Sequence, residues 1–260
     1  MPNTVVSAMG EGGVLTLRLN RPEKKNALSR EMYGALSDGL HAAAEDGAVR
    51  AVLLAGGEDF TAGNDIADFA ADGGAGEGVG RTSAALDFLE VLIRFPKPVV
   101  AAVRGVAIGI GTTMLLHCDA SVAARNARLQ MPFARLGLVP EAGSSVALAA
   151  RVGQARAQWM LMSGDAVDGE TAAREGLVTR AVDDAEVDAA AAAMAAQLAA
   201  LPPGAVAATK RLLREPQDAR LKEAMDRERA AFAALTQSLC HRFAALFEDG
   251  EPLTEQPWEL

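Results

Sequence analysis

The sequence predicts an α/β protein, with an α/β core over residues 1–184 and an all-helical region over residues 185–260. Up to Val182, short apolar runs rich in β-branched residues alternate with amphipathic segments of helical length. After Glu186 only helical patterns follow. Strands that alternate with helices and are followed by helices alone indicate this architecture. The 260 residues are 50% hydrophobic, which is enough to bury a sizeable core.

The first third of the chain contains clear strand and helix patterns. Strands are expected over Val14–Leu19, which alternates apolar and polar residues, and over the apolar run Ala51–Leu54. Helices are expected from an N-cap at Ser29 to about Glu45, and over Thr82–Phe95. Between them, Phe60–Ile66 (FTAGNDI) resembles a passage from a strand through a glycine bend into a helix.

The stretch from Pro98 to Asp119 contains a second bend of this kind. Val99–Val103 is a β-branched run typical of a buried strand, and Gly109-Ile110-Gly111 leads into an apolar, helix-length segment over Thr112–Cys118. Such a bend at a helix start presents free backbone N–H groups, which suit a phosphate or a negative charge developing on an oxygen. Two bends, each after an apolar strand, suggest one composite site.

The rest of the chain is mostly helical. The expected elements are a strand over Ala120–Ala124, helices over Val146–Val152 and Gln154–Ser163, a short helix between Asp168 and Gly176, a strand over Leu177–Val182, and helices over Asp188–Ala200 and Asp218–Glu248. The last helix carries apolar residues at helical spacing with charge on the opposite face. We expect it to pack on a neighbouring subunit.

Composition excludes several classes of protein. A formal net charge of −9 and a sequence pI near 4.9 argue against a general nucleic-acid binder. Cys118 and Cys240 lack metal-ligand spacing, so we expect reduced thiols. The N-terminus does not resemble a signal peptide, and no apolar run is long enough to span a bilayer. These features predict a cytoplasmic protein without nucleic-acid or membrane partners.

The familiar catalytic motifs are missing. The glycines of Asp72–Gly80 lack dinucleotide-binding spacing and indicate a mobile surface loop or an active-site lid. No G-x-S-x-G elbow, P-loop or HExxH motif is present. His41, His117 and His241 are scattered over expected helices, and no metal site is predicted. The chemistry is therefore expected at the glycine bends and at nearby carboxylates.

Four segments in this order resemble the crotonase superfamily, the enoyl-CoA hydratase/isomerase family. They are Asn20–Ser29 (NRPEKKNALS), Phe60–Ile66 (FTAGNDI), Arg104–Asp119 (RGVAIGIGTTMLLHCD) and Phe133–Ser145 (FARLGLVPEAGSS). The resemblance implies a spiral of ββα repeats with a C-terminal helical trimerisation region, assembled as a trimer or a dimer of trimers. It also implies an acyl-CoA thioester as substrate, with no separate cofactor.

The resemblance assigns roles to the residues of these motifs. The thioester carbonyl oxygen would be held by the backbone N–H groups of two residues, Asn64 after the Ala62-Gly63 bend and Ile110 after Gly109. Asp65 and Ile66 complete the first bend, and we expect Asp65 to be a structural cap. Lys24, Ala27 and Leu28 match the positions that grip the adenosine end of coenzyme A. Without the resemblance, Lys24 and Lys25 would be interpreted equally well as a solvated loop.

The chain departs from the family where hydratases carry two glutamates. Thr113 and Phe133 occupy those positions, and neither side chain is basic near neutral pH. Glu141 instead ends an LGLVPE segment that is similar to the acid/base site of some isomerases. A helix start would favour its anion, whereas Leu138 and Val139 would desolvate it. The structural alternative is that Glu141 only caps a helix beginning at Ala142.

These features predict an enoyl-CoA isomerase, in which Glu141 moves the proton while Asn64 and Ile110 hold the oxyanion. An enoyl-CoA hydratase or an acyl-CoA thioester hydrolase, in which Glu141 activates water, is the alternative on the same fold. A non-catalytic acyl-CoA-binding protein that lost both hydratase glutamates is the alternative of a different class.

Overall fold

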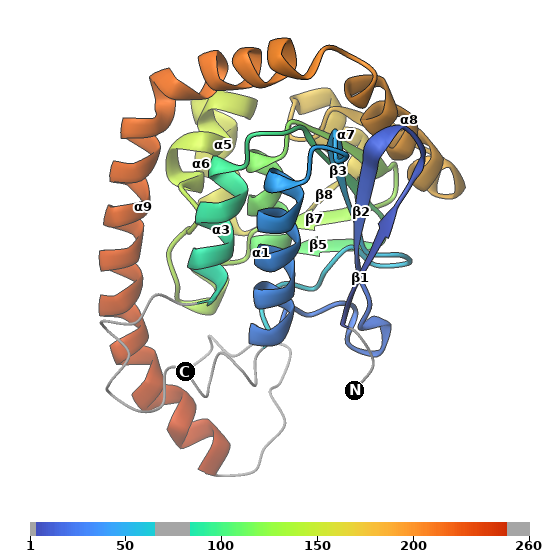
Figure 1. Cartoon of the computed structure of the whole chain (residues 1–260). Helices are drawn as coiled ribbons and strands as arrows, with labels where there is room; N and C mark the ends of the chain where they lie inside the picture. The colour runs from blue at the N-terminus through green and yellow to red at the C-terminus, as the bar shows by residue number, and fades with distance from the viewer. Residues whose placement is uncertain (1–3, 66–83, 249–260) are drawn as a thin grey trace.

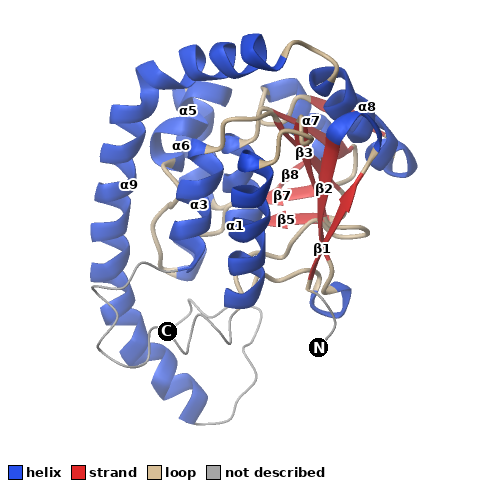
Figure 2. Cartoon of the chain, in the orientation of Figure 1, coloured by secondary structure: helices blue, strands red, loops and turns tan. Residues whose placement is uncertain are grey.

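A six-stranded sheet forms the centre of the molecule. The computed structural model describes residues 4–65 and 84–248, with side chains as far as 235. The strand order is β1-β2-β3-β4-β6-β9, in which β1 is antiparallel to β2 and all other neighbours are parallel. Figure 2 draws the strands in red, with β1 beside β2. The strands are β1 (Val5–Met9), β2 (Val14–Leu19), β3 (Ala51–Ala55), β4 (Val99–Val103), β6 (Ala120–Ala124) and β9 (Arg180–Val182).

A smaller sheet lies beside it, in the order β5-β7-β8, formed by β5 (Val106–Ile108), β7 (Arg128–Gln130) and β8 (Val167–Asp168). The chain passes from β4 to β5 and then into α4 (Ile110–Thr113) and η4 (Met114–His117). It then passes from β6 to β7, and from there through η5 (Ala134–Leu136) to α5 (Ser144–Val152). Each turn uses one strand of each sheet before a helix, which confirms the predicted spiral of ββα repeats.

Helices surround the two sheets (Figure 1). The remaining helices are η1 (Glu11–Gly13), η2 (Pro22–Lys24), α1 (Arg30–Glu45), α3 (Ala84–Arg94), α6 (Gln154–Ser163), α7 (Gly169–Glu175), η6 (Asp184–Glu186), α8 (Val187–Ala199) and α9 (Pro203–Glu248). The predicted cap at Ser29 is confirmed, because Ser29 Oγ accepts the Met32 N–H (3.3 Å). Asp168, at the expected start of the short helix, caps α7 in the same way, because its Oδ1 accepts the Thr171 N–H (2.7 Å). A side-chain acceptor at this position satisfies an otherwise free N–H of the first helical turn.

The core is buried on both faces of the central strands. Every residue of β3, β4 and β6 is buried, as expected for parallel strands covered on two sides. One helix of this cover, α8, packs on β3, β4 and β6 through a stripe spaced four residues apart, Val187, Ala191, Ala195 and Ala199. Such spacing puts the stripe on one helix face. The small side chains let α8 approach the sheet closely.

Three local predictions were wrong. Phe60–Ile66 forms no regular strand as far as Asp65, but only the single bridges Thr61–Ala107 and Leu28–Asn64. The helix expected over Thr112–Cys118 begins at Ile110 and tightens into 3-10 geometry from Met114. The structural alternative placed the start of a helix at Ala142, but α5 begins at Ser144, because Ala142 and Gly143 both have positive φ.

The short strands β5, β7 and β8, of two or three residues each, and the N-terminal strand β1 were not predicted. Runs as short as those of the smaller sheet carry no measurable alternation of apolar and polar residues. The predicted loop or lid over Asp72–Gly80 and the residue Ile66 lie outside the described residues.

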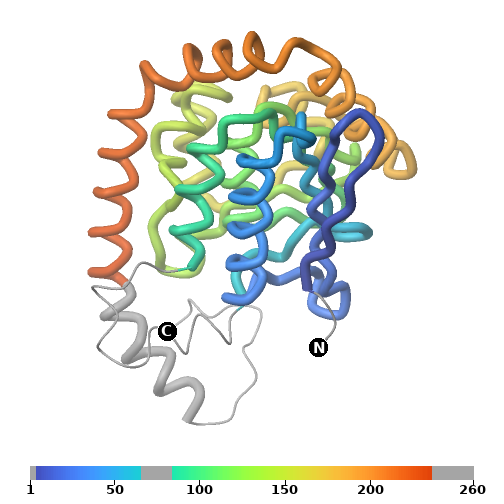
Figure 3. The backbone as a smooth tube through the Cα atoms, viewed as in Figure 1, coloured from blue at the N-terminus to red at the C-terminus, as the bar shows by residue number. Residues whose placement is uncertain are grey.

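The long helix α9 passes over the top of the molecule in Figure 1 and then descends along its left side, and the backbone tube in Figure 3 follows the same path. Pro216 lies inside it. Because proline has no N–H to donate, it favours a bend within a helix. Part of α9 packs on α5 of its own chain. Association with further copies stays a prediction.

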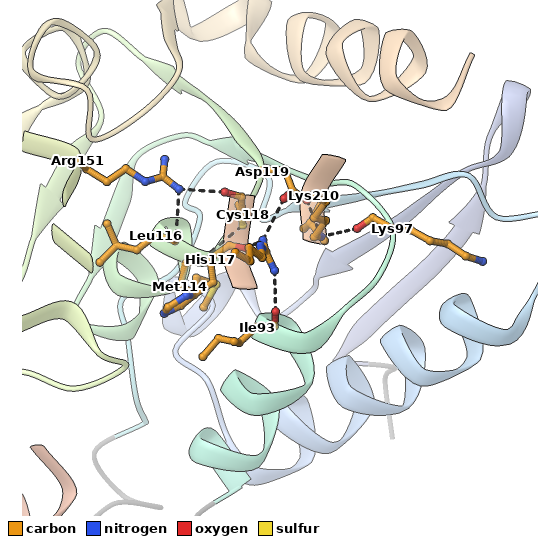
Figure 4. Close-up of polar contacts among 11 residues, drawn as sticks. Ile93, Lys97, Met114, Leu116, His117, Cys118, Asp119, Arg151 and Lys210 are labelled. Atoms are coloured by element: carbon orange, nitrogen blue, oxygen red, sulfur yellow. Dashed lines mark hydrogen bonds and ion pairs between the residues drawn. The ribbon is translucent and has the colours of Figure 1, made fainter. Parts of the chain in front are cut away.

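An ion-pair cluster around the buried Lys210 anchors α9 to the core (Figure 4). Asp119 Oδ2 accepts hydrogen bonds from Lys210 Nζ (2.7 Å) and the Val99 N–H (2.8 Å), and its Oδ1 accepts from Arg214 (3.0 Å). Lys210 also donates to the Lys97 carbonyl (2.6 Å). Burial lowers the pKa of Lys210 to about 8. The carboxylate partner and the carbonyl compensate for bringing this charge out of water.

Among the described residues, no single helix has both the length and the apolar character to cross a membrane. One bent pair, Asp184–Ala199 with Pro203–Leu235, meets the criterion by length and composition only.

Candidate active site

The two glycine bends lie side by side. The Thr61 N–H donates to the Val106 carbonyl (2.9 Å), and the Ile108 N–H donates to the Thr61 carbonyl (3.0 Å). Gly63 has a φ of +94°, and a Cβ there would lie 2.8 Å from the Ile108 oxygen. Gly109 has φ +55° and ψ −119°, a conformation that is essentially reserved for glycine. The backbone pairing therefore brings the two bends together, as the sequence predicted.

Each bend presents a backbone amide that is free to bind a ligand. Within residues 4–65 and 84–248, neither the Asn64 N–H nor the Ile110 N–H donates to a protein acceptor. Ile110 is the first residue of α4, where N–H groups have no partner within the helix. The neighbouring Gly109 N–H, in contrast, donates to the Gln130 carbonyl (2.8 Å). Two adjacent free amides have the composition of an oxyanion hole.

The segment from Lys24 to Leu28 pairs with the first bend. The Leu28 N–H donates to the Gly63 carbonyl (2.7 Å), and the Asp65 N–H donates to the Leu28 carbonyl (2.9 Å). In a parallel bridge of this kind, the N–H of the intervening residue Asn64 points away from the paired segment. This pairing therefore directs the Asn64 amide outward. Lys24 is exposed, so its ammonium is accessible to a phosphate.

Two side chains that the sequence analysis missed hold this bend. Tyr33 on α1 donates a hydrogen bond from Oη to Asn64 Oδ1. Arg21 forms an ion pair with Asp65 and donates to the Ala27 carbonyl (3.0 Å). These contacts agree with a structural role for Asp65, although the helix it was expected to cap lies outside the described residues. Tyr33 was not singled out from the sequence. It is buried on α1, and because a buried tyrosine hydroxyl needs a partner, this signal could have found it.

Glu141 contacts the second bend through a hydrogen bond with Thr113. Thr113 Oγ1 donates to Glu141 Oε1 (2.7 Å), so two positions that the sequence analysis singled out are in direct contact. Thr113 is three residues after Ile110, on the same face of the turn. Glu141 is not the residue that caps α5, because Ala142 and Gly143 separate it from the helix start. The alternative that Glu141 only caps a helix beginning at Ala142 is therefore wrong.

Burial raises the pKa of Glu141 to about 7. The Thr113 hydrogen bond lowers this pKa, and the negative charge of Glu228 raises it further. Of the two effects that the sequence left open, desolvation is the stronger. Burial also raises the pKa of Tyr33, and the charge of Glu141 adds to this, which places Tyr33 and Glu141 within electrostatic range. A carboxyl with this pKa can both accept and release a proton near neutral pH.

The remaining predicted positions have simpler surroundings. Phe133 is buried, and its carbonyl accepts the N–H groups of Leu136 (3.0 Å) and Leu138 (2.8 Å), so it shapes the turn that leads to Glu141. Ala62 is held by an N–H bond to the Lys25 carbonyl (2.9 Å). In the part of the chain that the structure describes, no three histidine, cysteine or carboxylate side chains come together as a metal site requires.

Similar proteins share both the sequence and the fold. The chain is 34% identical over 220 residues to the enoyl-CoA delta isomerase 2 of Rattus norvegicus, covering 84% of this chain but 56% of that protein. It is also 34% identical over 223 residues to the 2,3-dehydroadipyl-CoA hydratase of Escherichia coli K12, covering 85% of this chain and 86% of that protein.

Among solved structures, an enoyl-CoA hydratase/isomerase from Pseudoalteromonas atlantica T6c has a TM-score of 0.86 at 41% identity. The match covers 97% of this chain and all of that one. The fold is thus the crotonase fold that the four motifs predicted. A model of the family described as enoyl-CoA hydratase/isomerase matches residues 9–248, and the chain therefore belongs to the enoyl-CoA hydratase/isomerase family.

Proposed function

We propose that the protein is an enoyl-CoA isomerase, which moves a double bond of an acyl-CoA thioester from the 3 to the 2 position. The observation that carries this proposal is the hydrogen bond that places the Glu141 carboxyl against Thr113, three residues after the free Ile110 amide. Burial raises the pKa of this carboxyl to about 7, which suits it to proton transfer. An allylic shift needs one group that takes a proton and returns it, together with donors for the enolate oxygen.

In the proposed mechanism, the thioester oxygen accepts hydrogen bonds from the Asn64 and Ile110 amides. The Glu141 carboxylate removes a proton from C2, and the electron pair moves onto the oxygen to form a dienolate. The same carboxyl then returns the proton at C4, which leaves the double bond between C2 and C3. The fixed amides stabilise the developing charge without reorganisation, and one such donor is typically worth roughly 10²–10³ in rate.

Hydration is the second candidate, because the chain is equally similar to a named hydratase and to a named isomerase. In that reaction Glu141 would activate a water molecule for attack at C3. The local contacts favour isomerisation: Thr113 occupies one of the two glutamate positions of hydratases and donates to Glu141, and Phe133 occupies the other. Neither can serve as a second acid or base.

The deciding experiment incubates the protein with a 3-enoyl-CoA and a 2-enoyl-CoA in heavy water. Isomerisation predicts conversion of the first to a 2-enoyl-CoA, and deuterium at the carbon that is reprotonated. Formation of 3-hydroxyacyl-CoA would favour hydration instead, and release of free coenzyme A would favour thioester hydrolysis. Tight binding without any exchange would identify an acyl-CoA-binding protein.

Substitution of Glu141 tests the assigned base. Glu141→Gln keeps an oxygen that accepts the Thr113 hydrogen bond but cannot take a proton, so we expect isomerisation to be abolished. Affinity for the CoA thioester should stay within severalfold, because the amides remain. Glu45→Gln, an exposed position at the end of α1, is the matched control and should retain full activity. Full turnover by Glu141→Gln would remove this residue from the mechanism.

A further inference from the structure

The turn that carries Glu141 has an unfavourable backbone. Ala142 has a φ of +61° and Gly143 a φ of +68°, so two successive residues are left-handed. Glycine tolerates this region, whereas the Cβ of alanine makes it costly. Strained residues of this kind persist only where the surrounding structure holds them in place. The contacts that hold this turn therefore decide where the Glu141 carboxyl lies.

The strongest of these contacts comes from α9. Glu228 Oε2 accepts the Gly143 N–H (2.7 Å), and its Oε1 accepts the Ser145 N–H (2.9 Å), from a position 85 residues beyond Gly143. Glu228 is only 7% exposed. Its carboxylate thus binds two N–H groups at the start of α5, where the backbone has no acceptors of its own. Hydrogen bonds to a charged acceptor such as this carboxylate are stronger than hydrogen bonds between neutral groups.

The same face of α9 closes over the turn. A Cβ on Gly143 would lie 2.2 Å from Leu221 Cδ1 and 3.4 Å from Met225 Cγ. Leu221, Met225 and Glu228 are spaced at i, i+4 and i+7, so one helical face presents two apolar side chains and one carboxylate. This packing and the positive φ of Gly143 both favour glycine at position 143. The contacts of Leu221 and Met225 with Gly143 also set the distance between α9 and the turn.

A second group holds the turn from the core side. His117 Nε2 donates to the Ala142 carbonyl (2.7 Å), and burial lowers the pKa of His117 to about 4, so the ring is neutral. The Ser144 N–H donates to the Glu141 carbonyl (3.0 Å). The turn is therefore fixed between η4 and α9. Of these contacts, only the one with Glu228 is both charged and close enough to influence the Glu141 carboxyl electrostatically.

We propose that Glu228 is a positioning residue for the reaction, which holds the Glu141 turn through the Gly143 and Ser145 amides. This inference rests on the proposed function, because it assumes that Glu141 moves the proton. It assigns to α9 a role inside the active site of its own chain. A helix that serves only as a scaffold would need no buried carboxylate at this position.

The charges around the two carboxyls make the proposal testable by pH. Glu141 faces Thr113 of α4, Tyr33 of α1 and Glu228 of α9, and of these Glu228 raises its pKa. Burial raises the pKa of Glu228 as well, while its bonds from Ser145 and Gly143 and the charge of Arg227 lower it. Removal of the Glu228 charge should therefore let the Glu141 carboxyl ionise at lower pH.

The experiment compares Glu228→Gln, Glu228→Asp and the control Glu223→Gln. Glu223 is exposed on the same helix and pairs only with Arg227 among the residues that the structure describes. For Glu228→Gln we expect kcat to fall by up to about 100-fold from misplacement of the base, with KM changed far less. The acidic limb of its pH–rate profile should move to lower pH. Glu228→Asp keeps the negative charge, but its shorter side chain no longer reaches the Gly143 and Ser145 amides, so kcat should fall. The acidic limb of its pH–rate profile should stay closer to that of the unsubstituted protein.

The outcomes separate this proposal from its alternatives. A loss of kcat with an unmoved acidic limb in Glu228→Gln, in proportion to a lower Tm, would reduce Glu228 to a structural cap. Unchanged kcat in both variants would overturn the proposal directly. If Glu141→Gln retains activity, the proposed function fails first, whatever the Glu228 variants do. Hydrogen exchange of the Ser145 amide, faster in both Glu228 variants than in Glu223→Gln, reports the lost contact independently of activity.

Discussion

The two halves of the candidate site are built in different ways. The half proposed to bind the carbonyl oxygen consists of main-chain amides, that of Asn64, which backbone pairing directs outward, and that of Ile110 at the start of α4. The half proposed to move the proton consists of one side chain, Glu141, which accepts a hydrogen bond from Thr113 of α4 and lies in a turn held by Glu228 of α9. Main-chain donors depend on glycine conformations, whereas the carboxyl depends on distant side chains. Substitutions should therefore damage the two halves by different routes.

The oxyanion half should fail most completely when its backbone is changed. Gly109→Ala has open space for its Cβ, but its φ of +55° and ψ of −119° are incompatible with alanine. We expect the Ile110 amide to move, with a loss of roughly 10²–10³ in kcat and no shift of the pH–rate profile. Steady-state kinetics across pH would measure both quantities.

Gly12→Ala is the matched control for this change. Gly12 also has a positive φ, +67°, and open space around its Cβ, but it lies in η1. It should lower Tm without changing kcat. Equal kinetic loss in both variants would mean that general strain, rather than the position of the amide, causes the effect.

The proton-moving half should respond to Thr113 with a change in pH dependence. Thr113→Val keeps the shape of the side chain but removes the hydroxyl that donates to Glu141. Because this bond lowers the pKa of Glu141, its loss should raise that pKa above about 7. The base is then protonated over a wider pH range, so the acidic limb moves to higher pH and activity at acidic pH falls by up to about tenfold.

At alkaline pH the loss in Thr113→Val should nearly vanish, and Thr113→Ser should behave like the unsubstituted protein. A uniform loss at every pH would show that Thr113 positions the substrate instead. The predicted shift is opposite in sign to that of Glu228→Gln, so the two variants together test both influences on one carboxyl.

The smallest effect is expected at Tyr33, which supports the oxyanion half from α1. Tyr33→Phe removes the hydrogen bond to the Asn64 side chain but leaves the backbone pairing of the bend with Leu28. We expect a loss of roughly 0.5–1.5 kcal/mol in transition-state stabilisation, the usual value of one neutral hydrogen bond. Measurement of kcat/KM checks this. A loss as large as that of Gly109→Ala would contradict the view that main-chain pairing contributes more than the Tyr33 hydrogen bond to the position of this amide.

The parts of the site that were predictable are those formed within short stretches of chain. Gly63 and Gly109 indicate backbone bends in the sequence, and each bend exposes the backbone N–H of the next residue. The absence of glutamate at Thr113 and Phe133, and its presence at Glu141, can be read directly. In contrast, Glu228 lies on a helix whose pattern indicates only an apolar face and a charged face, so nothing distinguished it from the exposed Glu223.

The sequence by itself determined the alternation of strands and helices and the two bends, because glycine conformations, caps and apolar periodicity act over a few residues. The ββα spiral and the candidate base were implied by the resemblance of four motifs to the crotonase superfamily. Only the tertiary structure decided the pKa of Glu141, which depends on burial and on a charge from α9. It also decided that α5 begins at Ser144, after a left-handed turn that remote contacts stabilise. Burial and long-range contacts arise only when distant segments pack, so local patterns cannot specify them.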